Sequence, residues 1–199
     1  MQMDTSALPP IIGLTGRAGV GKSTAADILR NHGYIPKGFA DKIKGVLNQR
    51  FGWNPRMWED RTWKESQSPY FGCRLSYAGL EEFSPRSWAQ WLGTEVGRAI
   101  FGQDIWISLA MGELHYENRY IFADVRFPNE ATAIRDRGGV VIEILRDNVA
   151  PVNDHVSETP LPTHLIDYHV PNNGSRKDLE NALILSLAHY IDHQNAAGS

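Results

Sequence analysis

The chain has 199 residues, 42% of them hydrophobic, which is enough for one α/β domain with a full core. Its 20 basic and 23 acidic residues give a formal net charge of −3, which argues against a nucleic acid polymer as partner. The one cysteine, Cys73, excludes a disulfide framework and a zinc site built on cysteines. Because the chain shows no leader pattern and no long apolar run, we expect a soluble cytoplasmic protein with no membrane partner.

The first predicted elements are a buried strand over residues 10–15, a glycine-rich loop and a helix over residues 24–30. The loop fits the pattern G-x-x-x-x-G-K-S/T at every fixed position. Its glycines let backbone N–H groups converge on phosphate oxygens, and the helix dipole adds positive charge. A chance glycine-rich turn is the alternative, but the flanking strand and helix favour a nucleoside triphosphate site. The residues expected to bind the nucleotide here are Gly16, Ala18, Gly19, Val20, Gly21, Lys22, Ser23 and Thr24.

Three residues are expected to handle the charge of the phosphates. Lys22 would reach the β- and γ-phosphates, and the Ser23 hydroxyl would bind Mg²⁺. Asp124 ends a predicted strand over residues 120–124, which would bring it to the edge of the sheet beside the loop. Its carboxylate can hold Mg²⁺ there directly or through water, as in a Walker B motif. The alternative is an ordinary aspartate that caps a turn at the end of the strand.

Strands and helices alternate along the rest of the chain. Further strands are predicted over residues 34–40, 140–145 and 167–170, and further helices over 42–51, 129–137 and from Ser175 toward His193. This alternation predicts an α/β fold with a parallel sheet covered on both faces. Asp41, just after the second strand, has three candidate roles: a metal ligand through water, a contact to the sugar of an acceptor, or the N-cap of the next helix.

Residues 52–118 are too many for a simple crossover between strands, and they contain all six tryptophans. Several arginines lie between these tryptophans, a pattern that can stack on bases and grip phosphates. We favour the simpler interpretation, a small helical subdomain in which most of the tryptophans fill the core.

One helix in this region carries a more specific pattern. Ser84 and Pro85 predict its start, and the apolar spacing extends it over residues 86–101. The polar residues at successive i+4 positions would form a ridge: Arg86, Gln90, Thr94 and Arg98. Gly93 and Gly97 each cost about 1 kcal/mol in a helix interior, so another helix or a ligand should come close to them. The ridge suits an anionic ligand, and a solvated polar face is the equally weighted alternative.

Three strings of the sequence closely resemble the bacteriophage deoxynucleoside monophosphate kinases. They are F-A-D over residues 39–41, W-L-G-T-E-V-G-R over residues 91–98 and A-D-V-R-F-P-N-E-A over residues 123–131. The likeness extends from about Ile11 to the last helix. It implies a single P-loop kinase domain over residues 1–199 with a five-stranded parallel sheet flanked by helices. Within it, the core would comprise residues 10–51, 119–146 and 166–194, the helical acceptor-binding region 52–118 and a lid 147–165.

The resemblance also implies the reaction, which is transfer of the γ-phosphoryl of ATP to a deoxynucleoside monophosphate with Mg²⁺. On this pattern, Arg98 and Arg126 would contact the acceptor. The full set of residues expected to bind the acceptor also includes Asp41, Arg86, Gln90, Thr94 and Glu130. Residues 171–174, with Asn172 and Gly174, would lie near the adenine. The expected lid contains no lysine or arginine, so Arg17 or Arg146 would have to contact the transferring phosphate. The expected catalytic residues are therefore Lys22, Arg17 and Asp124.

Two other functions are compatible with a P-loop. One is another small-molecule kinase similar to dephospho-coenzyme A kinase, which shares the architecture but not the D-V-R-F-P-N-E string. The other is a nucleotide switch that transfers nothing, although the chain has no N-K-x-D guanine-reading motif. The sequence does not specify the accepted bases. A homodimer is the commonest assembly for such an enzyme, and a phage origin would place it in the host cytoplasm.

Overall fold

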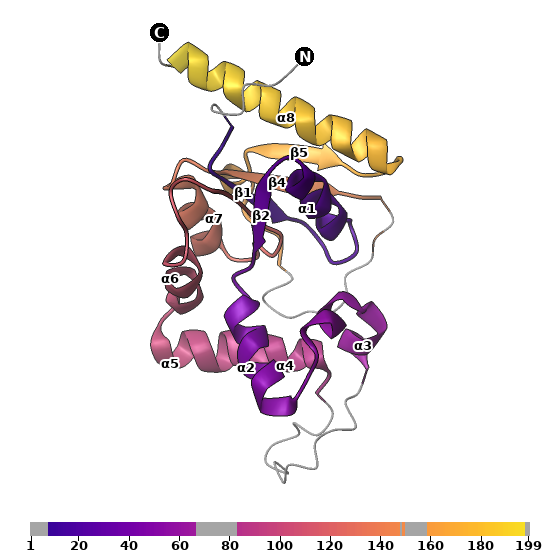
Figure 1. The fold of residues 1–199 in the computed structure, drawn as a ribbon, viewed down its shortest axis with the longest axis vertical. Coiled ribbons are helices and arrows are strands. Elements are labelled where there is room, and N and C mark those ends of the chain that lie inside the picture. The colour runs from indigo at the N-terminus through magenta and orange to yellow at the C-terminus, as the bar shows by residue number, and fades with distance from the viewer. Residues whose placement is uncertain (1–7, 67–82, 148, 150–158, 198–199) are drawn as a thin grey trace. The chain divides into compact units, whose positions relative to one another are not determined.

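The structure is a computed structural model that describes residues 8–66, 83–147, 149 and 159–197 (Figure 1). Cys73 and residues 148 and 150–158 of the expected lid lie outside the described residues. The chain divides into two compact units. The sheet unit consists of Met1–Phe39 and Gly112–Ser199, and the helical unit consists of Ala40–Met111.

The sheet unit is built on a five-stranded sheet in the order β2-β3-β1-β4-β5, and every neighbouring pair is parallel. The strands are β1 (Ile11–Thr15), β2 (Tyr34–Lys37), β3 (Arg119–Phe122), β4 (Val140–Leu145) and β5 (Tyr168–Pro171). Because β1 lies in the centre, the loop that follows it opens at the carboxyl edge of the sheet between its neighbours. The predicted α/β fold with a five-stranded parallel sheet is confirmed.

Three helices of the sheet unit cover the two faces of this sheet: α1 (Lys22–Asn31), α7 (Pro128–Arg135) and α8 (Arg176–Ala197). Figure 1 shows α8 running alongside β5. On one face, α1 and α8 share a core with alternate residues of the strands, such as Ile12 and Ile142. On the other face, a Cβ at Gly13 would crowd the Ile134 side chain, so this glycine lets α7 pack closely on β1.

The last helix begins as its sequence predicts. The Ser175 hydroxyl accepts a hydrogen bond from the Asp178 N–H at 3.3 Å, and the Asp178 carboxylate accepts one from the Ser175 N–H at 2.8 Å. The Ser175 hydroxyl also donates to the Asp178 carboxylate at 2.7 Å. This bond and the one from the Ser175 N–H favour the ionised carboxylate and so hold the pKa of Asp178 below its ordinary value. The capping box expected at Ser175 is confirmed.

The second strand is shorter than predicted, since it ends at Lys37 rather than at residue 40. The Phe39 N–H donates to Asp124 Oδ1 at 3.1 Å, so this backbone turns away from the sheet. Helix α2 then runs from Asp41 to Phe51 with Ala40 as its N-cap and no side-chain cap. The N-cap role considered for Asp41 is therefore wrong, because Asp41 is already the first residue of the helix.

The helical unit packs around its tryptophans. Besides α2, its elements are a 3-10 helix (Pro55–Glu59), α3 (Arg61–Glu65), α4 (Pro85–Trp91), a π-helical segment (Leu92–Arg98), α5 (Ala99–Phe101) and α6 (Ile105–Met111). Trp53, Trp88 and Trp106 are buried, and the other tryptophans pack against them. The prediction that tryptophan fills the core of a helical subdomain is confirmed.

The helix predicted over residues 86–101 is helical throughout but is not a regular α-helix, because the segment Leu92–Arg98 is π-helical. The wider turn breaks the i+4 register beyond Trp91, so the four-residue polar ridge does not form as predicted. The reason lies in α6. The Trp106 indole N–H donates to the Gly93 carbonyl at 2.7 Å, and a Cβ at Gly97 would overlap the Trp106 ring. Of the two alternatives for these glycines, the close approach of another helix is the one that the structure shows.

Candidate active site

The loop between β1 and α1 has the backbone of a phosphate cradle. Gly16, Gly19 and Gly21 have φ angles of +123°, +88° and +106°, which side chains rarely adopt. A Cβ at Gly16 would also overlap the Ile144 carbonyl. Helix α1 begins at Lys22 immediately after these glycines, so its unsatisfied N–H groups and positive dipole end face the loop.

The Lys22 ammonium lies across this loop. It donates to the carbonyls of Gly16 at 2.5 Å and Arg17 at 2.8 Å, which places the charge over the backbone that would surround the phosphates. Ser23 is exposed as the second residue of α1, so its hydroxyl is accessible to a ligand at the helix N-terminus. Both side chains therefore lie at the start of the helix that follows the glycine loop, and their contacts with phosphates and Mg²⁺ stay predictions.

Asp124 lies two residues beyond the end of β3, which stops at Phe122. Its Oδ1 accepts the Phe39 N–H, so part of its role is to hold the turn after β2. The turn role is thus confirmed for one carboxylate oxygen, and the metal role stays a prediction.

Glu130 is the third residue of α7, and its side chain is buried, with 3% of its surface exposed. Its Oε2 accepts the N–H groups of Arg126 at 2.8 Å and Phe127 at 3.1 Å. The carboxylate therefore caps α7 and fixes the backbone that carries Arg126. A direct contact between Glu130 and an acceptor, as the resemblance implies, stays a prediction.

A cavity of about 340 Å³ lies beside the P-loop in the sheet unit. Its walls come from the end of β1, the P-loop, the turn after β3, the end of β4 and residues 159–160. Arg17, Arg126 and Arg146 all line it. The Arg17 Nη1 donates to the Val149 carbonyl at 3.3 Å. Three guanidinium groups beside a P-loop form an environment suited to a highly charged phosphate.

Asn172 follows β5, and its side-chain amide donates to the Val20 carbonyl in the P-loop at 2.7 Å. Gly174 lies beside the start of α8, where a Cβ would crowd the Asp178 carboxylate. The segment expected near the adenine is thus adjacent to the P-loop through Asn172, while its contact with a base stays a prediction.

The remaining candidate residues belong to the helical unit. Arg86 forms an ion pair with Glu65 at 3.6 Å. Arg98 is 4% exposed, and its Nη1 donates to the Gln103 carbonyl at 2.7 Å, so it is not part of a solvated face. Gln90 and Thr94 are half-buried, and the Asp41 carboxylate lies 4.0 Å from the Lys44 ammonium.

The comparisons with known proteins agree on one family. The family profile described as deoxynucleotide monophosphate kinase matches residues 73–183. A putative deoxynucleotide monophosphate kinase of Acanthamoeba polyphaga mimivirus is 31% identical over 167 residues, which cover 76% of this chain and 81% of that protein. The chain belongs to the deoxynucleotide monophosphate kinase family.

Two phage relatives are similar over shorter stretches. The deoxynucleoside-5′-monophosphate kinase of Escherichia phage T5 is 30% identical over 118 residues, 55% of this chain and 46% of that protein. The deoxynucleotide monophosphate kinase of Escherichia phage RB69 is 28% identical over 117 residues, 56% of this chain and 48% of that protein. The matches thus span about half the length of these two relatives. The resemblance stated from the three sequence strings is confirmed, and with it the expectation of a nucleotide kinase.

Two acidic residues of the 340 Å³ cavity in this kinase were not singled out from the sequence. Glu143 and Asp147 line it together with the arginines. Glu143 lies in the otherwise apolar strand β4. Its carboxylate is 3.0 Å from the ring of His169, the residue paired with it on the neighbouring strand β5. A lone carboxylate in a buried strand was the available signal.

Lys64, in the helical unit of this kinase, is a third residue that the sequence patterns did not indicate. Its pKa lies below its ordinary value, because burial disfavours the ammonium and the nearby Arg86 adds a like charge. Positive charge is therefore concentrated around Arg86, beyond what the predicted ridge contained.

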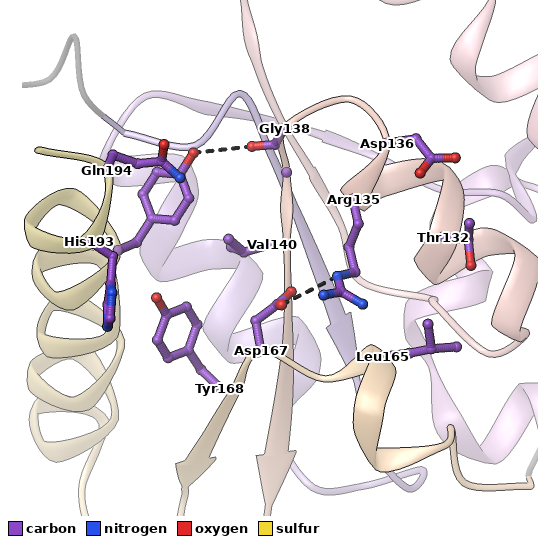
Figure 2. Close-up of a pocket in the computed structure, with 12 residues that line it drawn as sticks. Thr132, Arg135, Asp136, Gly138, Val140, Leu165, Asp167, Tyr168, His193 and Gln194 are labelled. Carbon is purple, nitrogen blue, oxygen red and sulfur yellow. Dashed lines mark hydrogen bonds and ion pairs between the residues drawn. The ribbon is translucent and has the colours of Figure 1, made fainter. Parts of the chain in front are cut away.

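A second cavity, of about 550 Å³, lies at the opposite end of the sheet, where β4 begins and β5 is about to begin (Figure 2). Arg135 forms an ion pair with Asp167 at 3.3 Å, and the Tyr190 hydroxyl donates to the Gly138 carbonyl at 3.2 Å. None of the residues predicted from the sequence lines this cavity. Since the P-loop follows the carboxyl end of β1, the two cavities lie at different edges of the sheet.

Among the described residues, no helix has the length and apolar character that crossing a bilayer requires.

Proposed function

We propose that this kinase transfers the γ-phosphoryl group of ATP to a deoxynucleoside 5′-monophosphate, giving the diphosphate and ADP. The observation that carries the proposal is the 340 Å³ cavity, which combines a P-loop with Arg17, Arg126 and Arg146 in a chain of this family. A nucleotide switch binds one phosphate chain, whereas transfer between two phosphates brings a second negatively charged group into the site and needs cations for both.

ATP would be held by the P-loop, with backbone N–H groups and the Lys22 ammonium on its phosphates, and the segment that carries Asn172 and Gly174 would lie near the adenine. The donor set also fits Mg²⁺, because the exposed Ser23 hydroxyl at the start of α1 and the Asp124 carboxylate after β3 are hard oxygen ligands that follow neighbouring strands of the sheet. When bound, the ion would neutralise negative charge on the β- and γ-phosphates.

The acceptor phosphate is already a nucleophile, so the reaction needs no general base. Catalysis then rests on positioning and on cancelling charge in the transition state. Lys22 and Arg17 are the proposed catalytic cations, and Arg146 lines the same cavity as Arg17. They take the place of the lid arginines that the sequence lacks.

Arg126 is the proposed acceptor contact from the sheet unit, and Glu130 holds the backbone of Arg126 in place. The helical unit supplies the other proposed acceptor residues: Asp41, Arg86, Gln90, Thr94 and Arg98. The homodimer and the cytoplasmic location stay predictions from the sequence.

The experiment that tests the proposed function is an acceptor panel. The protein is incubated with ATP, Mg²⁺ and one acceptor at a time: each deoxynucleoside monophosphate, each ribonucleoside monophosphate and dephospho-coenzyme A. We expect ADP only when a deoxynucleoside monophosphate is present, and the panel identifies the accepted bases. ADP that forms only when dephospho-coenzyme A is the acceptor contradicts the proposal. ADP that forms at the same rate whether or not an acceptor is present contradicts it as well.

Arg98→Ala is expected to raise KM for the monophosphate about tenfold or more and to change KM for ATP little. An acceptor phosphate carries about two negative charges, and the planar guanidinium can grip it with two hydrogen bonds. Arg98→Lys should recover only part of the affinity. The measurement is steady-state kinetics with each substrate varied in turn.

Because Arg98 is buried and holds the Gln103 carbonyl, its variants need a stability control. Thermal unfolding reports any loss of packing in the helical unit. Arg61→Ala removes an exposed arginine of the same unit and should alter neither KM. An acceptor KM that stays unchanged within error in a folded Arg98→Ala enzyme removes Arg98 from the site.

A further inference from the structure

The peptide between Val20 and Gly21 is held from outside the P-loop. The Asn172 side-chain amide donates to the Val20 carbonyl at 2.7 Å, although 152 residues separate the two in the chain. The described backbone contains no cis peptide, so the N–H of this peptide points opposite to its carbonyl. A partner that fixes the Val20 carbonyl therefore also fixes the direction of the Gly21 N–H.

Packing reinforces the hydrogen bond. Gly21 has a φ angle of +106° and precedes the first residue of α1, so it is the hinge between loop and helix. A Cβ at Gly21 would overlap the Asn172 amide nitrogen. The amide thus lies directly against the loop backbone, and the glycine is needed for this approach as well as for its φ angle.

Asn172 is itself firmly placed. Its own N–H donates to the Leu145 carbonyl at 2.7 Å, which continues the pairing of β5 with β4 by one residue. The next residue, Asn173, accepts the Asp147 N–H at 2.9 Å and donates to the Asp147 carboxylate at 2.7 Å. The loop after β5 is therefore anchored to the sheet, and it can transmit that rigidity to the P-loop.

We propose that Asn172 is a positioning residue for phosphate binding. Its amide holds the Val20–Gly21 peptide so that the Gly21 N–H stays directed at the phosphates of the bound nucleotide, and the side chain acts on the P-loop rather than on the adenine. The inference rests on the proposed function and deepens it, because it states that Asn172 supports binding of the phosphate chain of ATP.

The test uses two ligands that share phosphates but not a base. Binding of inorganic tripolyphosphate and of ATP is measured by calorimetry for the wild-type protein, Asn172→Ala and Asn118→Ala. Asn118 is a matched control, because its amide reaches the Tyr120 hydroxyl at the amino end of β3, away from the P-loop. We expect Asn172→Ala to weaken both ligands about tenfold, the effect of losing one such hydrogen bond, while Asn118→Ala changes neither.

Two outcomes overturn the inference. If Asn172→Ala weakens ATP but leaves tripolyphosphate unchanged, Asn172 contacts the base. If neither ligand is weakened, or if wild-type protein fails to bind tripolyphosphate, the amide does not serve phosphate binding.

A second variant covers the case in which Asn172→Ala does not fold, as judged by circular dichroism and thermal unfolding. Asn172→Asp keeps the shape but loses the donor, and it should also weaken tripolyphosphate. The loss should persist at high salt, where simple charge repulsion would be screened. Neither ligand is an acceptor, so this test is independent of phosphoryl transfer. If the protein passes it but phosphorylates no monophosphate, the proposed function is refuted and the role of Asn172 in phosphate binding is not.

Discussion

Lys22→Ala is expected to abolish turnover while leaving the fold intact. The Lys22 ammonium donates hydrogen bonds to the P-loop carbonyls of Gly16 and Arg17. When a nucleotide binds, the ammonium can exchange these partners for the β- and γ-phosphates. Removing one preorganised charge of this kind costs at least ~10²-fold in kcat. The measurement is the steady-state rate with saturating ATP and acceptor, beside a circular dichroism spectrum.

Lys177→Ala is the matched control for this variant. Lys177 is an exposed lysine of α8 that pairs with Glu180 at 3.0 Å, so its loss removes the same charge at a surface position outside the P-loop. Its rate should equal that of the wild type. Near-normal activity of Lys22→Ala together with a native circular dichroism spectrum would contradict the assignment of this loop as a P-loop.

Asp124→Asn is expected to impair catalysis more than ATP binding and to raise the Mg²⁺ concentration needed for half-maximal rate by about 10- to 100-fold. The structure makes this variant informative, because an asparagine keeps the Oδ1 acceptor for the Phe39 N–H and so preserves the turn after β2. The substitution removes the negative charge and one of the two oxygens that could bind Mg²⁺. The measurement is a Mg²⁺ titration of kcat beside an ATP-binding isotherm.

Asp192→Asn, on the exposed part of α8, controls for the change in net charge. If Asp124→Asn needs no more metal than Asp192→Asn, then Asp124 is only a turn residue. An equal loss of ATP affinity and kcat would instead indicate that the variant has disturbed the P-loop.

The parts of the fold that sequence patterns predict best are those set by neighbours in the chain. The strand, glycine loop and helix around Lys22 form a local unit, and the box between Ser175 and Asp178 is local as well. Their residue types leave few other conformations, so pattern and structure agree.

The parts that were mispredicted depend on contacts between distant residues. The strand after α1 stops early because Asp124 accepts the Phe39 N–H, and the helix after Pro85 widens because Trp106 packs on its glycines. No spacing rule within one helix contains either partner. The same reason hides Arg98, which an α-helical wheel places on a polar ridge and the structure buries.

For the candidate site, the sequence predicts several residues of the sheet unit that lie near the P-loop, but not the hydrogen bonds that they form. Asp124, Glu130 and Asn172 were all expected at the site, yet each carries a hydrogen bond to backbone that no motif specifies. These side chains hold loops in place, and their roles follow from the direction in which each one points. Arg126 and Arg146 share a cavity with the P-loop because β3 and β4 flank β1, a neighbourhood set by sheet order.

The most direct test of the central claim follows the transferred group itself. The protein is incubated with ATP labelled at the γ-phosphate, Mg²⁺ and an accepted deoxynucleoside monophosphate, and the products are separated. We expect the label in the terminal phosphate of the deoxynucleoside diphosphate, in amounts equal to the ADP formed, and no release when the acceptor is omitted. Label that appears instead as inorganic phosphate at a rate independent of the acceptor would contradict a phosphoryl-transfer function.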